Sequence, residues 1–327
     1  MKNEIIFTHG GGRFANQFTN FAHLIAFANQ NNFAIINIAF NDFSNLIENF
    51  KKSETVKYNF DKDDFNNYFL IKLFNLSKHR IYRKFIIRLL HLQAYLLPSY
   101  QSILFNKKSI LRFLNGRKFK NINLSDKKTL DLFALKTTTI IAGWGLRDWN
   151  LLEKKESLIK KELRFNEKYQ KISDDFINKI KEKHDLLIGV FMRQTDYKNY
   201  NDGKYYLQTE EYIVLMEKLK KRYSNRNLAF IVASDEPKNI EDFKNLPVYF
   251  STGIMGGEGH YIESFIQLGM CDYVLTVPST FSAWATFMGE SKIIPVYDKK
   301  MLVRESEYFN NNIFDAIKDE YFNNVIK

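Results

Sequence analysis

The stretch Gly10-Gly11-Gly12-Arg13-Phe14-Ala15-Asn16-Gln17 decides the fold of the N-terminal half of the chain. It joins a short apolar strand at residues 5–8 to an apolar-periodic helix that we expect at residues 18–30. Glycines suit such a sharp turn because they accept a positive φ and let a ligand approach the bare backbone. The helix N-terminus adds N–H groups and a positive dipole end, which bind phosphate-like groups. With a further strand at residues 33–40, the stretch predicts a β-α-β unit that opens on a binding turn.

Two other interpretations of this turn stay open. The pattern Gly10-x-Gly12-x-x-Ala15 matches the dinucleotide-binding fingerprint. However, the acidic residue that binds the ribose about 20 residues further on is missing, and the next strand reaches Asn41-Asp42 rather late. The remaining interpretation is an ordinary glycine turn without a ligand. The turn alone therefore favours a nucleotide-sugar enzyme over a dehydrogenase or a plain connection.

Length and cysteine content limit the class of protein. A chain of 327 residues predicts about two domains. The single cysteine, Cys271, excludes an intrachain disulfide and indicates a reducing compartment, where we expect it to be a small buried residue. The N-terminus leads directly into a strand, without the pattern of a signal peptide, and residues 89–106 are too polar for a membrane span. We expect a cytoplasmic protein, at most peripheral at the inner face of the cytoplasmic membrane.

The net charge of +11 is concentrated in one segment. Residues 65–125 contain no Asp or Glu. The basic residues there are Lys72, Lys78, Arg80, Arg83, Lys84, Arg88, Lys107, Lys108, Arg112, Arg117, Lys118 and Lys120. Apolar residues lie between them at spacings of amphipathic helices. Three interpretations stay open: a helical insertion with solvated cations, contact with an anionic membrane or acceptor, and nucleic-acid binding, which no zinc module or RNA-binding aromatic signature supports.

The C-terminal half alternates strands and helices. We expect strands at 186–192, 228–233, 248–250, 273–277 and 292–297, and helices at 210–223, 240–244, 261–271 and 281–289. This alternation predicts a doubly wound parallel sheet with ligands at the carboxyl ends of the strands. Two charged helical stretches, 151–163 and 167–184, precede it, and the second is a plausible bridge between lobes. Residues 41–135, in contrast, predict helices and loops with little strand pattern.

Polar motifs follow several of these strands. Arg193-Gln194-Thr195-Asp196-Tyr197 comes after the strand at 186–192, where a guanidinium suits a diphosphate because it stays charged and bonds two oxygens. Ser234-Asp235-Glu236 and Pro278-Ser279-Thr280-Phe281-Ser282 follow two further strands, the second at a helix N-terminus suited to phosphate. Taken singly, each motif also fits a structural role, as a surface ion pair of Arg193 with Asp196 or as ordinary helix caps.

Together the motifs resemble the fucosyltransferase superfamily, most closely bacterial α-1,2-fucosyltransferases. Gly12 to Gln17 is similar to the G-R-x-x-N-Q signature that protein O-fucosyltransferases share, and Gly143 to Trp149 resembles a G-Y/W-x-Q segment. The Arg193 motif resembles H-x-R-R-G-D-Y with Phe191, Gln194 and Thr195 replacing the His, second Arg and Gly. Residues 263–285 match the longest block, which ends in S-T-F-S-x-W-x-A.

The resemblance implies a GT-B-type α/β fold of two Rossmann-like lobes facing a cleft. Residues 1–165 would form the acceptor-side lobe, with a basic helical insertion at about 41–135, and residues 166–327 the nucleotide-sugar lobe. It also implies an inverting glycosyltransferase that moves fucose from GDP-fucose to a hydroxyl of a glycan acceptor, in surface polysaccharide or lipopolysaccharide synthesis. The alternatives are a same-fold enzyme for another nucleotide sugar, and a non-catalytic protein that binds nucleic acid or glycan.

The resemblance further implies roles for individual residues. The catalytic candidates are Arg193 and Asp196. The donor-binding candidates are Gly12, Asn16, Ser234, Asp235, Glu263, Ser279, Thr280, Phe281 and Ser282. The acceptor-binding candidates are Arg13, Trp144, Trp149 and Asp202. By their location after the Arg193 strand, Asp196, Asp202 and Glu211 are candidates for the general base, and we favour Asp196. His260 and Glu263 are alternative candidates for contact with guanosine. We expect no cofactor, no metal and no nucleic-acid partner, and we interpret Asp61-Lys62-Asp63 as a solvated turn.

Overall fold

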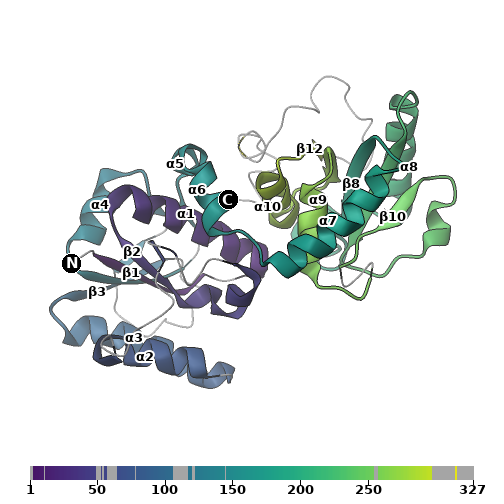
Figure 1. The fold of residues 1–327 in the computed structure, drawn as a ribbon. Coiled ribbons are helices and arrows are strands. Elements are labelled where there is room, and N and C mark those ends of the chain that lie inside the picture. The colour runs from purple at the N-terminus through teal and green to yellow at the C-terminus, as the bar shows by residue number, and fades with distance from the viewer. Residues whose placement is uncertain are drawn as a thin grey trace. The chain divides into compact units, whose positions relative to one another are not determined.

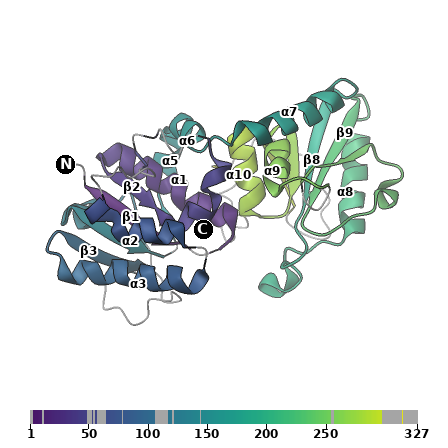
Figure 2. The ribbon, with the colours of Figure 1, turned by 60° about the horizontal axis from the view of Figure 1, so that its bottom comes forward.

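The computed structural model describes residues 3–10, 12–48, 53, 55–56, 65–77, 79–105, 117–119, 122–143, 145–253, 257–296 and 314. The chain divides into two compact units, Met1–Arg164 and Phe165–Lys327. Each contains a five-stranded parallel sheet with helices on both faces (Figures 1 and 2). Among the described residues, no helix is long and apolar enough to cross a membrane.

The first unit is built on the sheet β2-β1-β6-β3-β4. Its strands are β1 (Glu4–His9), β2 (Ala34–Asn37), β3 (Tyr100–Phe105), β4 (Arg117–Phe119) and β6 (Thr138–Ala142). Its helices are α1 (Phe14–Asn31), α2 (Phe65–Leu76), α3 (Arg80–Leu96), α4 (Lys127–Ala134), α5 (Trp149–Lys154) and α6 (Glu156–Glu162). Helices α2 and α3 cover one face of the sheet and α1 and α4 the other (Figure 1). A separate pair of short strands, β5 (Ile122–Asn123) and β7 (Leu146–Arg147), completes the unit.

Three expectations for this unit were wrong in detail. Helix α1 begins at Phe14 rather than at residue 18. The strand expected at 33–40 ends at Asn37, because the side chain of Asn37 accepts a hydrogen bond from the Phe40 N–H (3.1 Å) and caps a 3₁₀ helix, η1 (Ile38–Leu46). Most importantly, β3 lies between β6 and β4 in a region expected to lack strands. Its Gln101 side chain donates hydrogen bonds to Leu132 and Thr139, which satisfies a polar group inside the fold.

The second unit is built on the sheet β10-β9-β8-β11-β12. Its strands are β8 (Leu186–Met192), β9 (Leu228–Ser234), β10 (Val248–Phe250), β11 (Tyr273–Thr276) and β12 (Lys292–Pro295). Its helices are α7 (Glu167–Lys181), α8 (Thr209–Arg222), α9 (Tyr261–Gly269) and α10 (Thr280–Gly289), with 3₁₀ turns η3 (Tyr200–Gly203) and η4 (Ile240–Phe243). The predicted elements are present, with ends that differ from the predicted ones by at most three residues, except that residues 240–243 form a 3₁₀ turn.

Burial explains why β8 is the centre of this sheet. All seven of its residues are buried, as expected of a strand covered by helices on both faces. One face packs with Tyr212, Met216 and Leu219 of α8, and the other with Ile177 and Ile180 of α7. Helix α7 lies in the stretch that the sequence suggested as a plausible bridge between the lobes. Its Ile177 and Ile180 belong to the core of the second unit.

Helices α9 and α10 approach each other through glycines. A Cβ built on Gly289 would lie 2.1 Å from the Gly269 carbonyl oxygen, so no other residue fits there without movement of the backbone. Cys271 lies close by, fully buried as expected, with its thiol donating to the Gln267 carbonyl (3.3 Å). This tight packing joins the C-terminal ends of α9 and α10.

Candidate active site

The candidate active site of the second unit lies where the order of its strands reverses. The chain passes from β8 to β9 and β10 on one side, and then returns to place β11 and β12 on the other side of β8. Ligands of doubly wound sheets bind outside the carboxyl ends of the strands at such a switch point. Here the two flanking strands are followed by Arg193 and by Pro278-Ser279-Thr280.

Arg193 is held in place by two carboxylates. Its Nη1 atom lies 2.8 Å from Asp235 Oδ2, and its Nη2 atom lies 2.7 Å from Asp196 Oδ1. The guanidinium also packs over the ring of Tyr197, 5.6 Å from the centroid. The Arg193 side chain is 16% exposed. The structure thus presents a guanidinium of fixed orientation at the mouth of the switch point.

Asp235 organises the loop that carries Arg193. Besides the guanidinium, it accepts hydrogen bonds from the Gln194 N–H (2.7 Å), the Thr195 N–H (3.3 Å) and the Thr195 hydroxyl (2.6 Å). Its side chain is 15% exposed, whereas that of Asp196 is 48% exposed. Asp235 thus fixes the conformation of the Arg193 loop, and Asp196 is the more exposed of the two carboxylates. The contact of Asp235 with a donor stays a prediction.

Tyr197 joins the two sides of the switch point. It is buried, and its hydroxyl donates a hydrogen bond to the carbonyl of Pro278 (2.6 Å). Burial raises the pKa of Tyr197 above its ordinary value, so the phenol stays protonated and remains a donor. This bond sets the loop after β8 against the loop after β11.

Several polar groups at the N-terminus of α10 are hydrogen-bonded to one another. Ser279 caps the helix by accepting the Phe281 N–H (3.2 Å). Ser282 is completely buried, and its hydroxyl bonds Thr276 Oγ1 (2.9 Å) and the Ser279 carbonyl (3.2 Å). The Ser282 hydroxyl is thus engaged within the loop, and its contact with a donor stays a prediction. Thr280 and Phe281 are partly exposed.

Phe281 explains one departure from the family pattern. Its ring stacks on Phe191, with centroids 5.0 Å apart, and meets Phe265 edge-on at 5.1 Å. Phe191 occupies the position of the histidine in the resembling motif, and it is buried. The site thus has an aromatic support where the family pattern has an ionisable group.

Two further predicted donor residues are engaged within the protein. The Ser234 hydroxyl accepts the Glu236 N–H (3.1 Å) at the end of β9. Glu263 is buried, and its two oxygens accept the His260 N–H (3.0 Å) and the Thr252 hydroxyl (2.7 Å). Glu263 thereby holds the segment that follows β10, and its contact with a donor stays a prediction.

His260 stands at the start of α9 next to aromatic rings. Its Nδ1 accepts the Ile262 N–H (3.2 Å), and its ring lies 4.2 Å from the centroid of Tyr261 and 5.2 Å from that of Tyr169. Burial lowers the pKa of His260, which favours the neutral ring. A neutral imidazole among aromatic rings is chemically suited to contact a nucleobase. The contact of His260 with guanosine stays a prediction.

Gly12, Arg13 and Asn16, three predicted residues of the first unit, follow the carboxyl end of β1. Gly12 has φ +76°, and a Cβ there would lie 2.5 Å from the Asn16 amide, so the turn requires glycine. Arg13 is exposed at the N-cap of α1, and Asn16 is half-buried one turn further. The Arg13 carbonyl accepts the N–H groups of Asn16 and Gln17 (both 3.1 Å).

The structure describes one of the two tryptophans predicted to bind the acceptor. Trp144 lies outside the described residues, as does Asp61-Lys62-Asp63. Trp149 is the first residue of α5, and its ring meets His23 of α1 edge-on at 4.4 Å. Burial lowers the pKa of His23 well below its ordinary value. Trp149 therefore helps to attach α5 to α1. Among the residues that the structure describes, no three His, Cys, Asp or Glu side chains gather as a metal site would require.

The loop after Arg193 carries a feature that sequence reasoning missed. Tyr200 stacks on Tyr197 and Tyr205, with centroids 5.5 Å and 6.0 Å away, and is 43% exposed. The predicted acceptor residue Asp202 lies on this loop, exposed and with φ +54°. The recurrence of tyrosines at 197, 200, 205 and 206 was the available signal. An exposed, supported ring of this kind is suited to the apolar face of a sugar.

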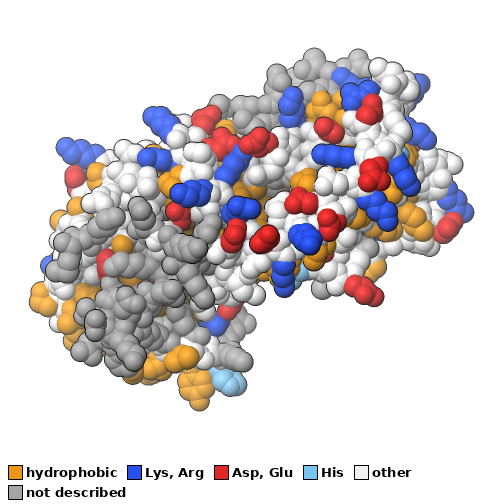
Figure 3. Space-filling model, viewed as in Figure 1, with side chains coloured by type: hydrophobic (Ala, Val, Ile, Leu, Met, Phe, Trp, Pro, Cys, Tyr) orange, Lys and Arg blue, Asp and Glu red, His pale blue; other side chains and the backbone are white. Residues whose placement is uncertain are grey.

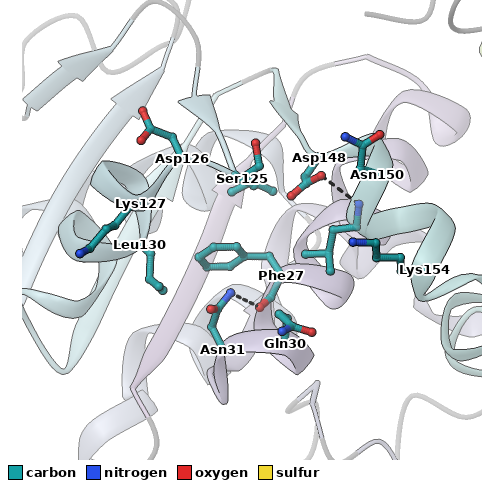
Figure 4. A pocket seen from close by; sticks show the side chains of 12 residues that line it. Phe27, Gln30, Asn31, Ser125, Asp126, Lys127, Leu130, Asp148, Asn150 and Lys154 are labelled. Carbon is teal, nitrogen blue, oxygen red and sulfur yellow. Dashed lines mark hydrogen bonds between the residues drawn. The ribbon is translucent and has the colours of Figure 1, made fainter.

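A separate cavity of about 500 Å³ lies in the first unit, between α1, α4 and α5 (Figure 4). Its two carboxylates are helix caps. Asp126 caps α4 by accepting the Lys128 N–H (3.0 Å), and Asp148 caps α5 by accepting the Leu151 N–H (2.9 Å). None of the residues predicted for donor or acceptor lines it. We therefore do not include it in the candidate active site.

The comparison with protein families decides the class. The sequence model of glycosyl transferase family 11 matches residues 74–319, well over half of the chain. This chain belongs to glycosyltransferase family 11. The match includes the Arg193 loop and the block at 263–285, and begins after the glycine turn at residues 10–17. The predicted resemblance and the predicted enzyme class are confirmed. No curated protein sequence matches the chain significantly.

Solved structures show the same fold. A mutant of Arabidopsis thaliana FUT1 in complex with GDP has a TM-score of 0.57 at 10% identity, over 91% of this chain and 71% of that one. POFUT1 in its apo form has a TM-score of 0.52 at 14% identity, over 89% and 95%. POFUT1 in complex with GDP-fucose has a TM-score of 0.51 at 13% identity, over 91% and 99%. The family 11 enzyme thus has the predicted GT-B-type α/β fold.

Proposed function

We propose that this glycosyltransferase moves fucose from GDP-fucose to a hydroxyl of a glycan acceptor, with inversion at the anomeric carbon. The observation that carries the proposal is Arg193, oriented by Asp235 at the carboxyl end of the central strand. Family membership and the fold shared with POFUT1, which was solved with GDP-fucose, support the choice of donor. The acceptor class follows the resemblance to α-1,2-fucosyltransferases and suits surface polysaccharide or lipopolysaccharide synthesis at the cytoplasmic face of the membrane.

In this proposal the diphosphate binds between Arg193 and the N-terminus of α10. A guanidinium bonds two phosphate oxygens at once, and helix N–H groups add partial positive charge. Both interactions grow stronger as the bond between fucose and the β-phosphate breaks and negative charge collects on GDP. At the N-terminal end of α10, Thr280 and Phe281 are partly exposed, whereas Ser279 and Ser282 are buried.

Donor binding would also release the general base. In the free protein, Asp196 is bonded to Nη2 of Arg193 and is half-exposed. A phosphate oxygen that takes this place on Arg193 leaves the Asp196 carboxylate able to accept a proton. The acceptor oxygen then attacks the anomeric carbon, its proton passes to Asp196, and the electron pair of the broken C–O bond leaves with GDP. A single displacement of this kind inverts the configuration.

Two measurements test the proposal. GDP should raise the melting temperature because a ligand at a hundred times its Kd stabilises the folded state by about 2.7 kcal/mol; UDP and NAD should not. Mass spectrometry of products from GDP-fucose and a panel of galactosides should then detect a fucosylated product. Stabilisation by UDP and not by GDP would assign the site to another nucleotide sugar. GDP binding without any product from any sugar donor would support a non-catalytic binding protein instead.

A further inference from the structure

Helix α3 has two apolar faces. Ile86 and Leu90 pack into the core against the sheet, together with Phe74 of α2. On the other side, Ile81, Phe85, Leu92 and Leu96 follow one another at spacings of four, seven and four residues, which places them in one stripe. Their exposed fractions are 79%, 55%, 44% and 71%. A helix that needed only to cover the sheet would carry polar side chains in this stripe.

Helix α2 adds a second exposed stripe. Phe69, Leu73 and Leu76 lie four and three residues apart and are 47%, 39% and 83% exposed. Helices α2 and α3 lie side by side on the outer face of the first unit (Figures 1 and 2). Figure 3 shows hydrophobic side chains along this edge of the unit. Seven exposed large apolar side chains that recur at helical spacings on two neighbouring helices favour an interaction site over scattered surface hydrophobics.

The charged residues in the sequences of α2 and α3 are all basic. Arg88 is exposed and Lys84 half-exposed on α3, whereas residues 65–125 contain no Asp or Glu. Arg83 has a structural role, because it bonds the Ser77 carbonyl (2.7 Å), forms an ion pair with Asp42 and lies over the Phe74 ring. Lys84 and Arg88 are thus the described cations of α3 that remain for an outside partner. A partner that fits this surface has an apolar layer for the two stripes and anionic groups next to that layer for Lys84 and Arg88.

We propose that the outer faces of α2 and α3 form a docking surface for an anionic lipid bilayer. The apolar stripes enter the boundary between headgroups and acyl chains, and Lys84 and Arg88 contact the anionic headgroups, as in other interfacial helices. A second copy of the chain fits less well, because two segments with a strong excess of cations would meet face to face. A nucleic acid would match the cations but leave the aliphatic stripe exposed to water.

The test is sedimentation of the full chain with vesicles, without donor or acceptor. Phosphatidylcholine vesicles containing phosphatidylglycerol should bind the protein at low salt and release most of it near physiological salt, where the screening length falls from about 30 Å to about 8 Å. The double variant Lys84→Gln/Arg88→Gln should bind about thirtyfold more weakly, since each cation near an anionic leaflet contributes about 1 kcal/mol. The variant Ile81→Ser/Phe85→Ser should lose binding at every salt concentration.

Matched variants of α7 serve as controls. Lys171→Gln/Lys179→Gln removes the same charge, and Ile172→Ser removes an exposed apolar side chain, both from the second unit. These controls should bind as the wild type does, and circular dichroism should show all variants folded. Equal sedimentation with neutral and anionic vesicles would overturn the proposal, as would equal losses in the α3 and α7 variants. Self-association that only the α3 apolar variant abolishes, or RNA binding without vesicle binding, would also overturn it. Because the donor is absent, the outcome is independent of the proposed reaction.

Discussion

Replacing Asp235 with Asn separates the positioning of Arg193 from its charge. The substitution keeps the shape and the Oδ1 acceptor, which receives the N–H groups of Gln194 and Thr195. It converts Oδ2 into an amide donor facing Nη1 of Arg193 and the Thr195 hydroxyl, both of which are donors in the native loop. The variant therefore loses one charge-assisted bond and disturbs a second without removing the guanidinium.

The magnitude follows from these bonds. A hydrogen bond to a charged group contributes about 1.5–3 kcal/mol, and Asp235 is only 15% exposed, so little of this is screened. We expect a stability loss of about 2 kcal/mol and a fall in kcat/KM of about ten- to a hundredfold, from the misplaced guanidinium. Arg193→Ala, which removes the group itself, should cost about 10²–10³ in rate. Asp235→Asn should thus lie between the wild type and Arg193→Ala.

The assay is initial-rate kinetics with GDP-fucose and an active acceptor, paired with urea unfolding. Asp272→Asn is the matched control, because the Asp272 carboxylate accepts the Leu187 N–H (2.8 Å) at the opposite edge of the same sheet. We expect this control to lose some stability and to keep its rate. Wild-type kinetics for Asp235→Asn, or an equal loss of rate in Asp272→Asn, would refute the positioning role of Asp235.

Four further predictions concern the bonds around the site, a buried histidine of the first unit and the need for a metal. Tyr197→Phe should destabilise the fold by about 1–3 kcal/mol, because it leaves the buried Pro278 carbonyl without its donor, and it should lower kcat; an unchanged kcat would show that the bond is structural only. Ser282→Ala should lower the melting temperature and leave the KM for the donor unchanged, and a raised KM would support the predicted contact of Ser282 with the donor. Burial lowers the pKa of His91 to about 3, so between pH 7.5 and pH 5 only the unfolded chain protonates this histidine. Unfolding titrations should therefore show a loss of about 2 kcal/mol in the free energy of unfolding over this range. His91→Gln should show a weaker dependence of that free energy on pH. EDTA should leave turnover unchanged, and a loss that Mn²⁺ restores would assign a role to the acidic residues at 61–63.

The second unit was the part most readily predicted from sequence. Leu186–Met192 is a run of seven apolar residues, and only a strand covered on both faces buries all of them. The expected strand and the observed strand therefore coincide. The polar motifs then fall at strand ends because their residues interrupt the apolar runs. The regular alternation of strands and helices predicted a doubly wound parallel sheet, and the structure supplies the order of its strands.

The first unit was harder because its third strand carries no clear period. Residues 100–105 mix Gln101 and Ser102 with apolar side chains, and only the folded structure supplies their partners. His91 of α3 bonds both the Ser102 hydroxyl (2.7 Å) and the Thr8 hydroxyl (2.9 Å), which connects three elements far apart in sequence. Local patterns do not contain such contacts, so a strand of this kind is invisible before the fold is known.

The same limit applies within the site, where sequence identifies residue types but not their partners. Phe191 and Gln194, which depart from the family pattern, are both buried: Phe191 stacks on Phe281, and the Gln194 amide donates to the Leu207 carbonyl (2.7 Å). Arg193, which matches the pattern, is the residue whose charge stays at the mouth of the switch point. Since Gln194 cannot supply a second guanidinium, the loop after β8 offers a diphosphate one guanidinium, that of Arg193. In the proposed reaction, Arg193 is therefore the guanidinium of this loop that neutralises the diphosphate. Asp235, which fixes the orientation of Arg193, should for this reason have a large effect on the rate.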